Sequence, residues 1–197
     1  MRVLVGCECS QTVAGAFLRA GHDAYSCDIS PAYGSYPDRH LQGDLREIYN
    51  KFNPDLFIAH PPCTFLSHAG YVRLVSGGRL NWLRYEHGLI ARDFFLWCLS
   101  RPAPMICIEN PVPISLYGLP SPTQYIEPYY FGEPYSKKTG LWLVGLPELV
   151  PTDLVLPLAS WTAVHYSQRI RSKTFEGVAA AMVSQWGCGV QNQLRLF

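Results

Sequence analysis

The stretch RVLVGCECSQTVAGAFLRAGHDAYSCD, residues 2–28, decides the fold class of this 197-residue chain. Its short apolar run Val3-Leu4-Val5 is typical of a strand. Residues 13–20 predict a helix, and residues 24–27 predict a second strand. A strand, a helix and a second strand in this order form a βαβ unit, in which the two strands lie parallel in one sheet. We therefore expect an α/β fold with a mostly parallel sheet.

The same pattern continues along the chain as far as residue 187. Further strands are expected at 55–59 and 105–108, and helices at 45–52, 85–100 and 174–186. Two segments, 125–131 and 140–144, flank a polar turn and predict an antiparallel hairpin at the edge of the sheet. Weak periodicity and several glycines in residues 64–82 predict a mobile loop over the site. We expect one domain, residues 1–187, and a tail, residues 188–197.

The composition fits one globular domain. A chain with 48% apolar and 16% charged residues is not disordered, and no run approaches the roughly 18 apolar residues of a membrane span. Seven irregularly spaced cysteines fit a reducing cytoplasm better than a disulfide framework. Cys7 and Cys9 are closer together than zinc ligands usually are, so no metal is expected. The net charge of +1 leaves nucleic acid open, because a nearly neutral protein can carry a basic patch.

The residues after two predicted strands carry the chemistry. The run Leu56-Phe57-Ile58-Ala59 is followed by His60-Pro61-Pro62-Cys63, where two prolines stiffen the turn that holds a thiol. The run 105–108 is followed by Glu109, and a carboxylate at the end of an apolar strand needs a partner. In parallel α/β sheets both side chains would face the crevice where ligands bind. Alternatively, Cys63 is a small buried apolar residue, Glu109 pairs with an arginine of the last third, and His60 is structural.

A second group of candidates lies around the first predicted strand. The turn Gly6-Cys7-Glu8-Cys9-Ser10 stands where such folds receive a nucleotide-like cofactor, although it lacks the G-x-G-x-x-G spacing. Asp28 ends the second strand and is placed either to bind ribose hydroxyls or to form a turn. Asp44 precedes a helix, and therefore binds the cofactor or caps that helix.

These motifs together resemble the carbon-5 cytosine DNA methyltransferases. The order G-C-E-C-S, an acid after strand two, G-D-L, H-P-P-C and I-E-N-P is similar to the short phage and prophage branch, in which H-P-P-C replaces P-P-C-Q. The similarity extends over F-G-E-P-Y-S-K-K-T-G-L-W-L and S-K-T-F-E-G-V-A-A-A-M, and so over nearly the whole chain. It implies the class I methyltransferase fold, a bacterial cytoplasmic location and S-adenosylmethionine as cofactor. The residues that would bind the cofactor are Gly6, Cys7, Glu8, Cys9, Ser10, Asp28, Ile29, Asp44, Leu45, His60 and Pro61.

The resemblance also implies a mechanism. Cys63 would add as a thiolate to ring carbon 6 of cytosine and so activate carbon 5. Glu109 would hold the ring nitrogen and exocyclic amine while charge develops. A cytosine in duplex DNA would have to be flipped out of the base stack.

Two departures from the family pattern affect substrate binding. The family's Q-x-R-x-R is represented here by Gln168-Arg169-Ile170-Arg171, so Arg169 or Arg171 would have to position the cytosine. A separate target-recognition domain has no room between residue 171 and the last helix. Recognition would then fall to loops 64–82 and 111–138, or be nearly absent.

The tail predicts one more partner. Its sequence Gln193-Leu194-Arg195-Leu196-Phe197 resembles the short motif that docks into the bacterial replication sliding clamp, with Gln193, Leu194, Leu196 and Phe197 as contacts. The alternative is that these apolar side chains pack back on the domain. Two other functions stay open: the same chemistry on a free cytosine nucleotide, and a catalytically silent protein that binds DNA or the clamp.

Overall fold

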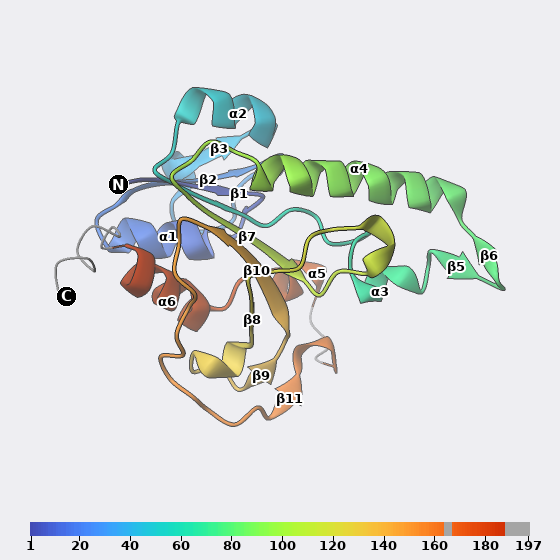
Figure 1. Cartoon of the computed structure of the whole chain (residues 1–197). Coiled ribbons are helices and arrows are strands. Elements are labelled where there is room, and N and C mark those ends of the chain that lie inside the picture. The colour runs from blue at the N-terminus through green and yellow to red at the C-terminus, as the bar shows by residue number, and fades with distance from the viewer. Residues whose placement is uncertain (164–166, 188–197) are drawn as a thin grey trace.

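A seven-stranded sheet forms the centre of the molecule (Figure 1). The computed structural model describes residues 1–163 and 167–187. The strand order is β3-β2-β1-β4-β7-β10-β8, in which β3 to β7 pair in parallel and β10 is antiparallel to both neighbours. The strands are β1 (Arg2–Gly6), β2 (Asp23–Asp28), β3 (His40–Gln42), β4 (Leu56–Ala59), β7 (Met105–Pro111), β8 (Gln124–Ile126) and β10 (Thr139–Val144). The expected α/β class, with a mostly parallel sheet and an antiparallel edge hairpin, is confirmed.

Helices cover both faces of this sheet. Figure 1 shows α1 (Thr12–Arg19) and α6 (Glu176–Trp186) on one side, and α2 (Leu45–Phe52) and α4 (Trp82–Leu99) on the other. Successive side chains of a strand point to opposite faces, so Val3 and Val5 pack in the cluster under α1 and α6, whereas Leu4 belongs to the cluster under α2 and α4. All four residues of β4 are buried, as a parallel strand covered on both faces requires.

The expected element boundaries agree closely with the structure. Helix α2 has the predicted bounds, and α1, α4 and α6 differ from the predicted ranges by one to three residues at an end. Strand β7 is longer than predicted because β10 pairs along it as far as Pro111. The predicted hairpin segment 125–131 is shorter as a strand, since β8 ends at Ile126.

Residues 64–82 differ from the mobile loop we expected. They contain α3 (His68–Tyr71) and an antiparallel hairpin of β5 (Val75–Ser76) and β6 (Arg79–Leu80). Gly77 and Gly78 both have positive φ, as a tight two-residue hairpin turn needs. These elements were missed because two to four residues are too few to show a periodicity. We call residues 68–81 the arm; Figure 1 shows its hairpin at the far end of α4, away from the sheet.

Smaller elements complete the described chain. Strand β9 (Tyr135–Ser136) pairs in parallel with β11 (Ala159–Ser160), and α5 (Gln168–Arg171) precedes the last helix. Short 3₁₀ turns lie at Pro37–Arg39, Ser115–Tyr117, Pro128–Tyr130 and Trp161–Ala163. Within 1–163 and 167–187, no helix combines the length and apolar character needed to cross a bilayer. The clamp-like tail, with Gln193, Leu194, Leu196 and Phe197, lies outside the described residues.

Candidate active site

The ends of β4 and β7 bring the two expected catalytic motifs together. Ala59 and Ile108 are paired in the sheet, so His60 and Glu109 both follow the last shared pair. The Nδ1 of His60 lies 2.9 Å from Oε2 of Glu109. In addition, Asn110 is fully buried and its Nδ2 donates a hydrogen bond of 2.8 Å to the carbonyl of Pro61. The H-P-P-C turn is thus held to the E-N segment at two points.

Cys63 lies in a tight turn at this edge. Its carbonyl accepts hydrogen bonds from the amides of Leu66 and Ser67, each at 3.1 Å. Burial raises the pKa of the Cys63 thiol, the Glu109 carboxylate raises it further, and the Lys137 ammonium partly opposes them. The thiol is therefore mainly protonated at neutral pH, and a nucleophilic role requires removal of its proton during the reaction.

His60 and Glu109 form a largely buried pair, with side chains 12% and 17% exposed. Burial would raise the pKa of Glu109, but the hydrogen bond and charge of His60, with help from Lys137, bring it below its ordinary value. Burial would lower the pKa of His60, but Glu109 and then Glu8 raise it. Each member of the pair thus favours the charged form of the other. The Nε2 of His60 is buried and has no hydrogen-bond partner among the described residues.

Lys137 is a site residue that the sequence reasoning missed. It lies between β9 and β10, and its charge acts on Cys63, Glu109 and His60. Its only signal in the sequence was the S-K-K-T segment of the family-like motif. We expected a base-positioning cation from Arg169 or Arg171. The guanidinium of Arg169 instead stacks 3.7 Å from the ring centre of Tyr33.

Arg171 contacts Lys137 and Trp161 through its backbone carbonyl. Its carbonyl accepts a hydrogen bond of 3.3 Å from Nζ of Lys137 and another of 3.2 Å from the indole of Trp161. Helix α5 therefore holds the Lys137 ammonium, whose charge acts on the thiol, and no described contact brings the Arg171 guanidinium to Cys63 or Glu109.

A cavity of about 580 Å³ adjoins the H-P-P-C turn and contains five of the expected cofactor residues. Those five are Cys7, Asp28, Ile29, Asp44 and Leu45. Pro62 lines it on the side of the nucleophile. Its volume is in the range of small-ligand sites. Cys7 has φ 59, a left-handed conformation that is uncommon for a residue with a side chain and often found at functional sites.

For Asp28 and Asp44 the sequence left open a role in the local turn or cap and a role at the cofactor site. The structure gives both residues the local role and also places them at the cavity. One oxygen of Asp28 accepts from the amide of Ser30 at 2.9 Å, which makes it a turn former. One oxygen of Asp44 accepts from the amide of Arg46 at 2.8 Å, which makes it the N-cap of α2. Both residues also line the cavity, and each has a second carboxylate oxygen without a hydrogen bond in the described structure.

The residues that line this cavity suit a nucleoside. Carboxylate oxygens suit ribose hydroxyls, and Ile29, Ile90 and Phe94 offer an apolar wall for a flat base. Ile29 is 77% exposed and Ile90 63%, so both present apolar surface that a ligand would cover. S-adenosylmethionine carries such a nucleoside, and these residues therefore suit it.

The other expected cofactor residues support the cavity without lining it. A Cβ at Gly6 would lie 2.5 Å from the side chain of Leu45, so glycine lets Leu45 reach the cavity wall. Glu8 caps α1, since its carboxylate accepts from the amides of Val13 and Ala14 at 2.7 and 3.1 Å.

Three further residues fix neighbouring turns instead of facing the cavity. The hydroxyl of Ser10 donates to Glu8, the carbonyl of Cys9 accepts from the amide of Tyr33, and the carbonyl of Pro61 is occupied by Asn110. His60, as described above, is bound to Glu109.

Comparison with known proteins finds solved structures of similar fold. No protein-family model and no curated protein matches the chain. Among solved structures, an E. coli DNA modification methyltransferase encoded within a prophage aligns with a TM-score of 0.50 and 14% identity, over 79% of this chain and 52% of its own.

Two other methyltransferases align less well. S. pombe Dnmt2 has a TM-score of 0.46 and 13% identity, over 75% of this chain and 51% of its own. Entamoeba histolytica EhMeth has a TM-score of 0.44 and 12% identity, over 79% of this chain and 57% of its own. This chain spans about half the length of these methyltransferases. The first match and the strand order together show that the chain has the α/β fold of class I methyltransferases, mostly parallel with an antiparallel edge.

Proposed function

We propose that this protein is an S-adenosylmethionine-dependent methyltransferase that modifies carbon 5 of cytosine in DNA. The observation that carries the proposal is that the turn of Cys63 is held to the Glu109–Asn110 segment of the neighbouring strand, by His60 bound to Glu109 and Asn110 bound to Pro61, beside a nucleoside-sized cavity. The likeness in fold to a DNA modification methyltransferase supports the substrate class.

The cavity residues would hold the cofactor. S-adenosylmethionine, when bound, supplies an electrophilic methyl group. Asp28 would accept hydrogen bonds from the ribose hydroxyls with its second oxygen, and Ile29 and Phe94 would cover the base. Pro62 and Phe65 line the same cavity and flank Cys63 in the chain, so a ligand there lies next to the nucleophile.

Cys63 would activate the cytosine. Carbon 5 of cytosine is too weak a nucleophile to take a methyl group directly. Addition of the thiolate to ring carbon 6 breaks the aromatic system and places electron density on carbon 5. After methylation, loss of the proton from carbon 5 returns an electron pair to the ring and breaks the bond from carbon 6 to sulfur.

Glu109, His60 and Lys137 would stabilise the charge that this addition creates. One oxygen of Glu109 is bound to His60, and the carboxyl group would contact the ring nitrogen and exocyclic amine of the base. The proton on His60 can pass to Glu109 and on to the ring nitrogen as the ring becomes negative. Lys137 favours the thiolate form of Cys63 by its positive charge.

The test is transfer of a labelled methyl group to duplex DNA, single-stranded DNA and deoxycytidine monophosphate. We expect transfer to cytosine carbon 5 of DNA and a covalent complex at Cys63 with DNA containing 5-fluorocytosine. Cys63→Ser should abolish both, while the neighbouring Thr64→Ala, whose exposed side chain makes no described hydrogen bond, should retain them. Glu109→Gln should lower the single-turnover rate by about a hundred-fold. Transfer by the serine variant, or an adduct at another cysteine, would refute the mechanism.

A further inference from the structure

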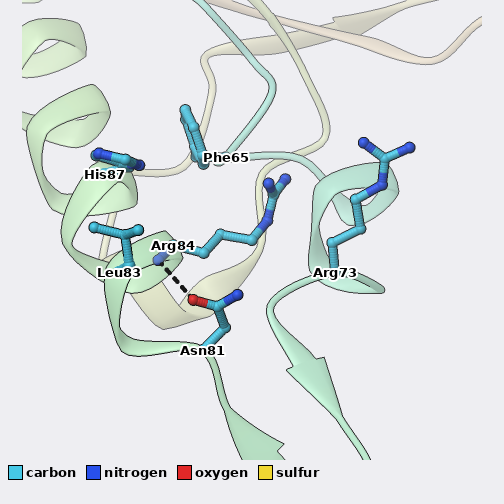
Figure 2. A pocket seen from close by; sticks show the side chains of 6 residues that line it. All are labelled: Phe65, Arg73, Asn81, Leu83, Arg84 and His87. Atoms are coloured by element: carbon cyan, nitrogen blue, oxygen red, sulfur yellow. Dashed lines mark hydrogen bonds between the residues drawn. The ribbon is translucent and has the colours of Figure 1, made fainter.

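A second cavity, of about 390 Å³, lies between the arm and the first two turns of α4. Figure 2 shows its lining: Phe65 after the H-P-P-C turn, Arg73 from the arm, and Asn81, Leu83, Arg84 and His87 at the start of α4. Phe65 and His87 also line the 580 Å³ cavity and therefore form a wall common to both. The second cavity is thus next to the candidate cofactor site.

Arg84 links the start of α4, which lines this cavity, to the segment that follows Cys63. Its Nη2 donates to the carbonyl of Thr64 at 2.9 Å, and its Nε donates to the carbonyl of Gly70 at 3.3 Å. Its guanidinium also lies 4.8 Å from the ring centre of Phe65. Phe65 is two residues after Cys63, so their Cα atoms are at most about 7 Å apart. The cavity therefore adjoins the segment that carries the thiol.

The surroundings of the cavity are positively charged. Residues 64–87 contain three arginines, Arg73, Arg79 and Arg84, and one acid, Glu86, in a chain whose net charge is only +1. In the described part of the chain, none of these arginines has a carboxylate oxygen within 4.0 Å. Arg73 and Arg79 are exposed and make no side-chain hydrogen bond there. Such cations are suited to bind phosphate.

Apolar and aromatic side chains border the same surface. Val72 is 76% exposed, Trp82 68% and Leu83 64%, and Trp82 stands where the arm joins α4. Aromatic rings interleaved with arginines are typical of surfaces that follow a polynucleotide strand, because bases stack on the rings while phosphates meet the cations. The arm is anchored below by Leu74, which is buried in the cluster under α4.

We propose that this cavity and the arm bind the phosphodiester backbone of a polynucleotide immediately beside the target cytosine. Arg84 and His87 meet the phosphate in the cavity, Arg73 and Arg79 meet the neighbouring phosphates, and Trp82 stacks on an adjacent base. This inference rests on the proposed function, since it names the element that would hold the DNA. It assigns to the arm a substrate-binding role in a chain about half as long as the methyltransferases with which it aligns.

The experiment measures binding of a fluorescein-labelled single-stranded oligonucleotide by anisotropy, without cofactor, over a series of salt concentrations. The Arg73→Ala/Arg79→Ala double variant should bind more weakly, and its salt slope should fall by about 0.7 for each phosphate that the variant no longer neutralises. Arg92→Ala is the matched control, because Arg92 lies on α4 outside the cavity and pairs with Asp93. It should keep the wild-type affinity and slope. Thermal unfolding of each variant verifies that it is folded.

Each further outcome decides between the two proposals. Unchanged binding and salt slope in a folded double variant that still methylates DNA would overturn this inference and leave the proposed function intact. Arginine-dependent binding without any methyl transfer would support polynucleotide binding by the arm and refute the proposed function. If deoxycytidine monophosphate displaced the oligonucleotide at equal phosphate concentration, the cavity would be a mononucleotide site and the inference would fail.

Discussion

At the scale of single residues, the electrostatics around Cys63 govern its chemistry. Burial and Glu109 both raise the pKa of the thiol, and Lys137 is the cation that opposes them. A thiolate is the reactive form of cysteine. The fraction of Cys63 that is ready to react therefore depends on a lysine from the turn between β9 and β10, more than seventy residues further along the chain.

Replacement of that lysine gives a direct test. Lys137→Met keeps the chain length but removes the charge, so it should raise the pKa of Cys63 and slow its alkylation by iodoacetamide at a fixed, mildly alkaline pH. Peptide mass spectrometry would measure alkylation of Cys63 separately from the other cysteines. Lys138→Met is the matched control, since Lys138 lies 4.4 Å over the ring of Tyr125 and does not act on Cys63. An identical alkylation profile for Lys137→Met would contradict this role.

At the scale of elements, the turns after β1, β2 and β3 shape the cofactor cavity. Glu8 binds the first amides of α1, Asp28 closes the turn after β2, and Asp44 caps α2. In each case a carboxylate oxygen accepts a hydrogen bond from a backbone amide, which fixes the turn. Asp28 and Asp44 each use one oxygen for the turn and also line the cavity, so one side chain serves both the turn and the proposed binding.

Two substitutions of Asp44 separate its roles. Asparagine is as good an N-cap as aspartate but is uncharged, so Asp44→Asn should preserve stability while weakening binding of S-adenosylhomocysteine. Asp44→Ala removes the cap as well and should cost about 1 kcal/mol of unfolding free energy. Calorimetry measures the affinity and urea unfolding the stability. Equal affinity of Asp44→Asn and wild type would assign Asp44 to capping alone.

At the scale of the whole molecule, the His60–Glu109 pair joins neighbouring strands in the middle of the sheet. The imidazole faces Glu109 from β7, Glu8 from the turn after β1 and Lys137 from the turn before β10. Its pKa is raised and that of Glu109 is lowered. The raised pKa stabilises the fold below the unfolded value of about 6.5, and that contribution is lost as pH rises through the folded value. The lowered pKa of Glu109 stabilises the fold above about 4.3 and is lost in stronger acid.

The pair should therefore make stability depend on pH in a specific window. His60→Asn keeps an amide donor but cannot be charged. The difference in unfolding free energy between wild type and this variant should be greatest near pH 5 to 6 and should shrink as pH rises further. Urea unfolding over that pH series measures it. A difference that did not change with pH would show that the two groups are not an ion pair.

The sequence by itself determined the fold class, the order of the main elements and the two strand ends that carry Cys63 and Glu109. These features are local, because apolar runs, helix periodicity and turn residues are encoded in neighbouring positions. It also pointed to Asp28 and Asp44, because parallel strands deliver their following turns to one edge. Ile29 and Leu45 followed from the resemblance to methyltransferases, and all four residues line the cavity.

Only the tertiary structure decided which groups meet across that edge. It bound His60 to Glu109, where the sequence had suggested a cofactor contact, and it gave Glu8 to α1. It brought the charge of Lys137 to act on the thiol, stacked Arg169 on Tyr33, and folded residues 68–81 into an arm. These outcomes depend on contacts between residues far apart in the chain. The distance between side chains on different elements is set by the packing of the whole sheet, which no local pattern records.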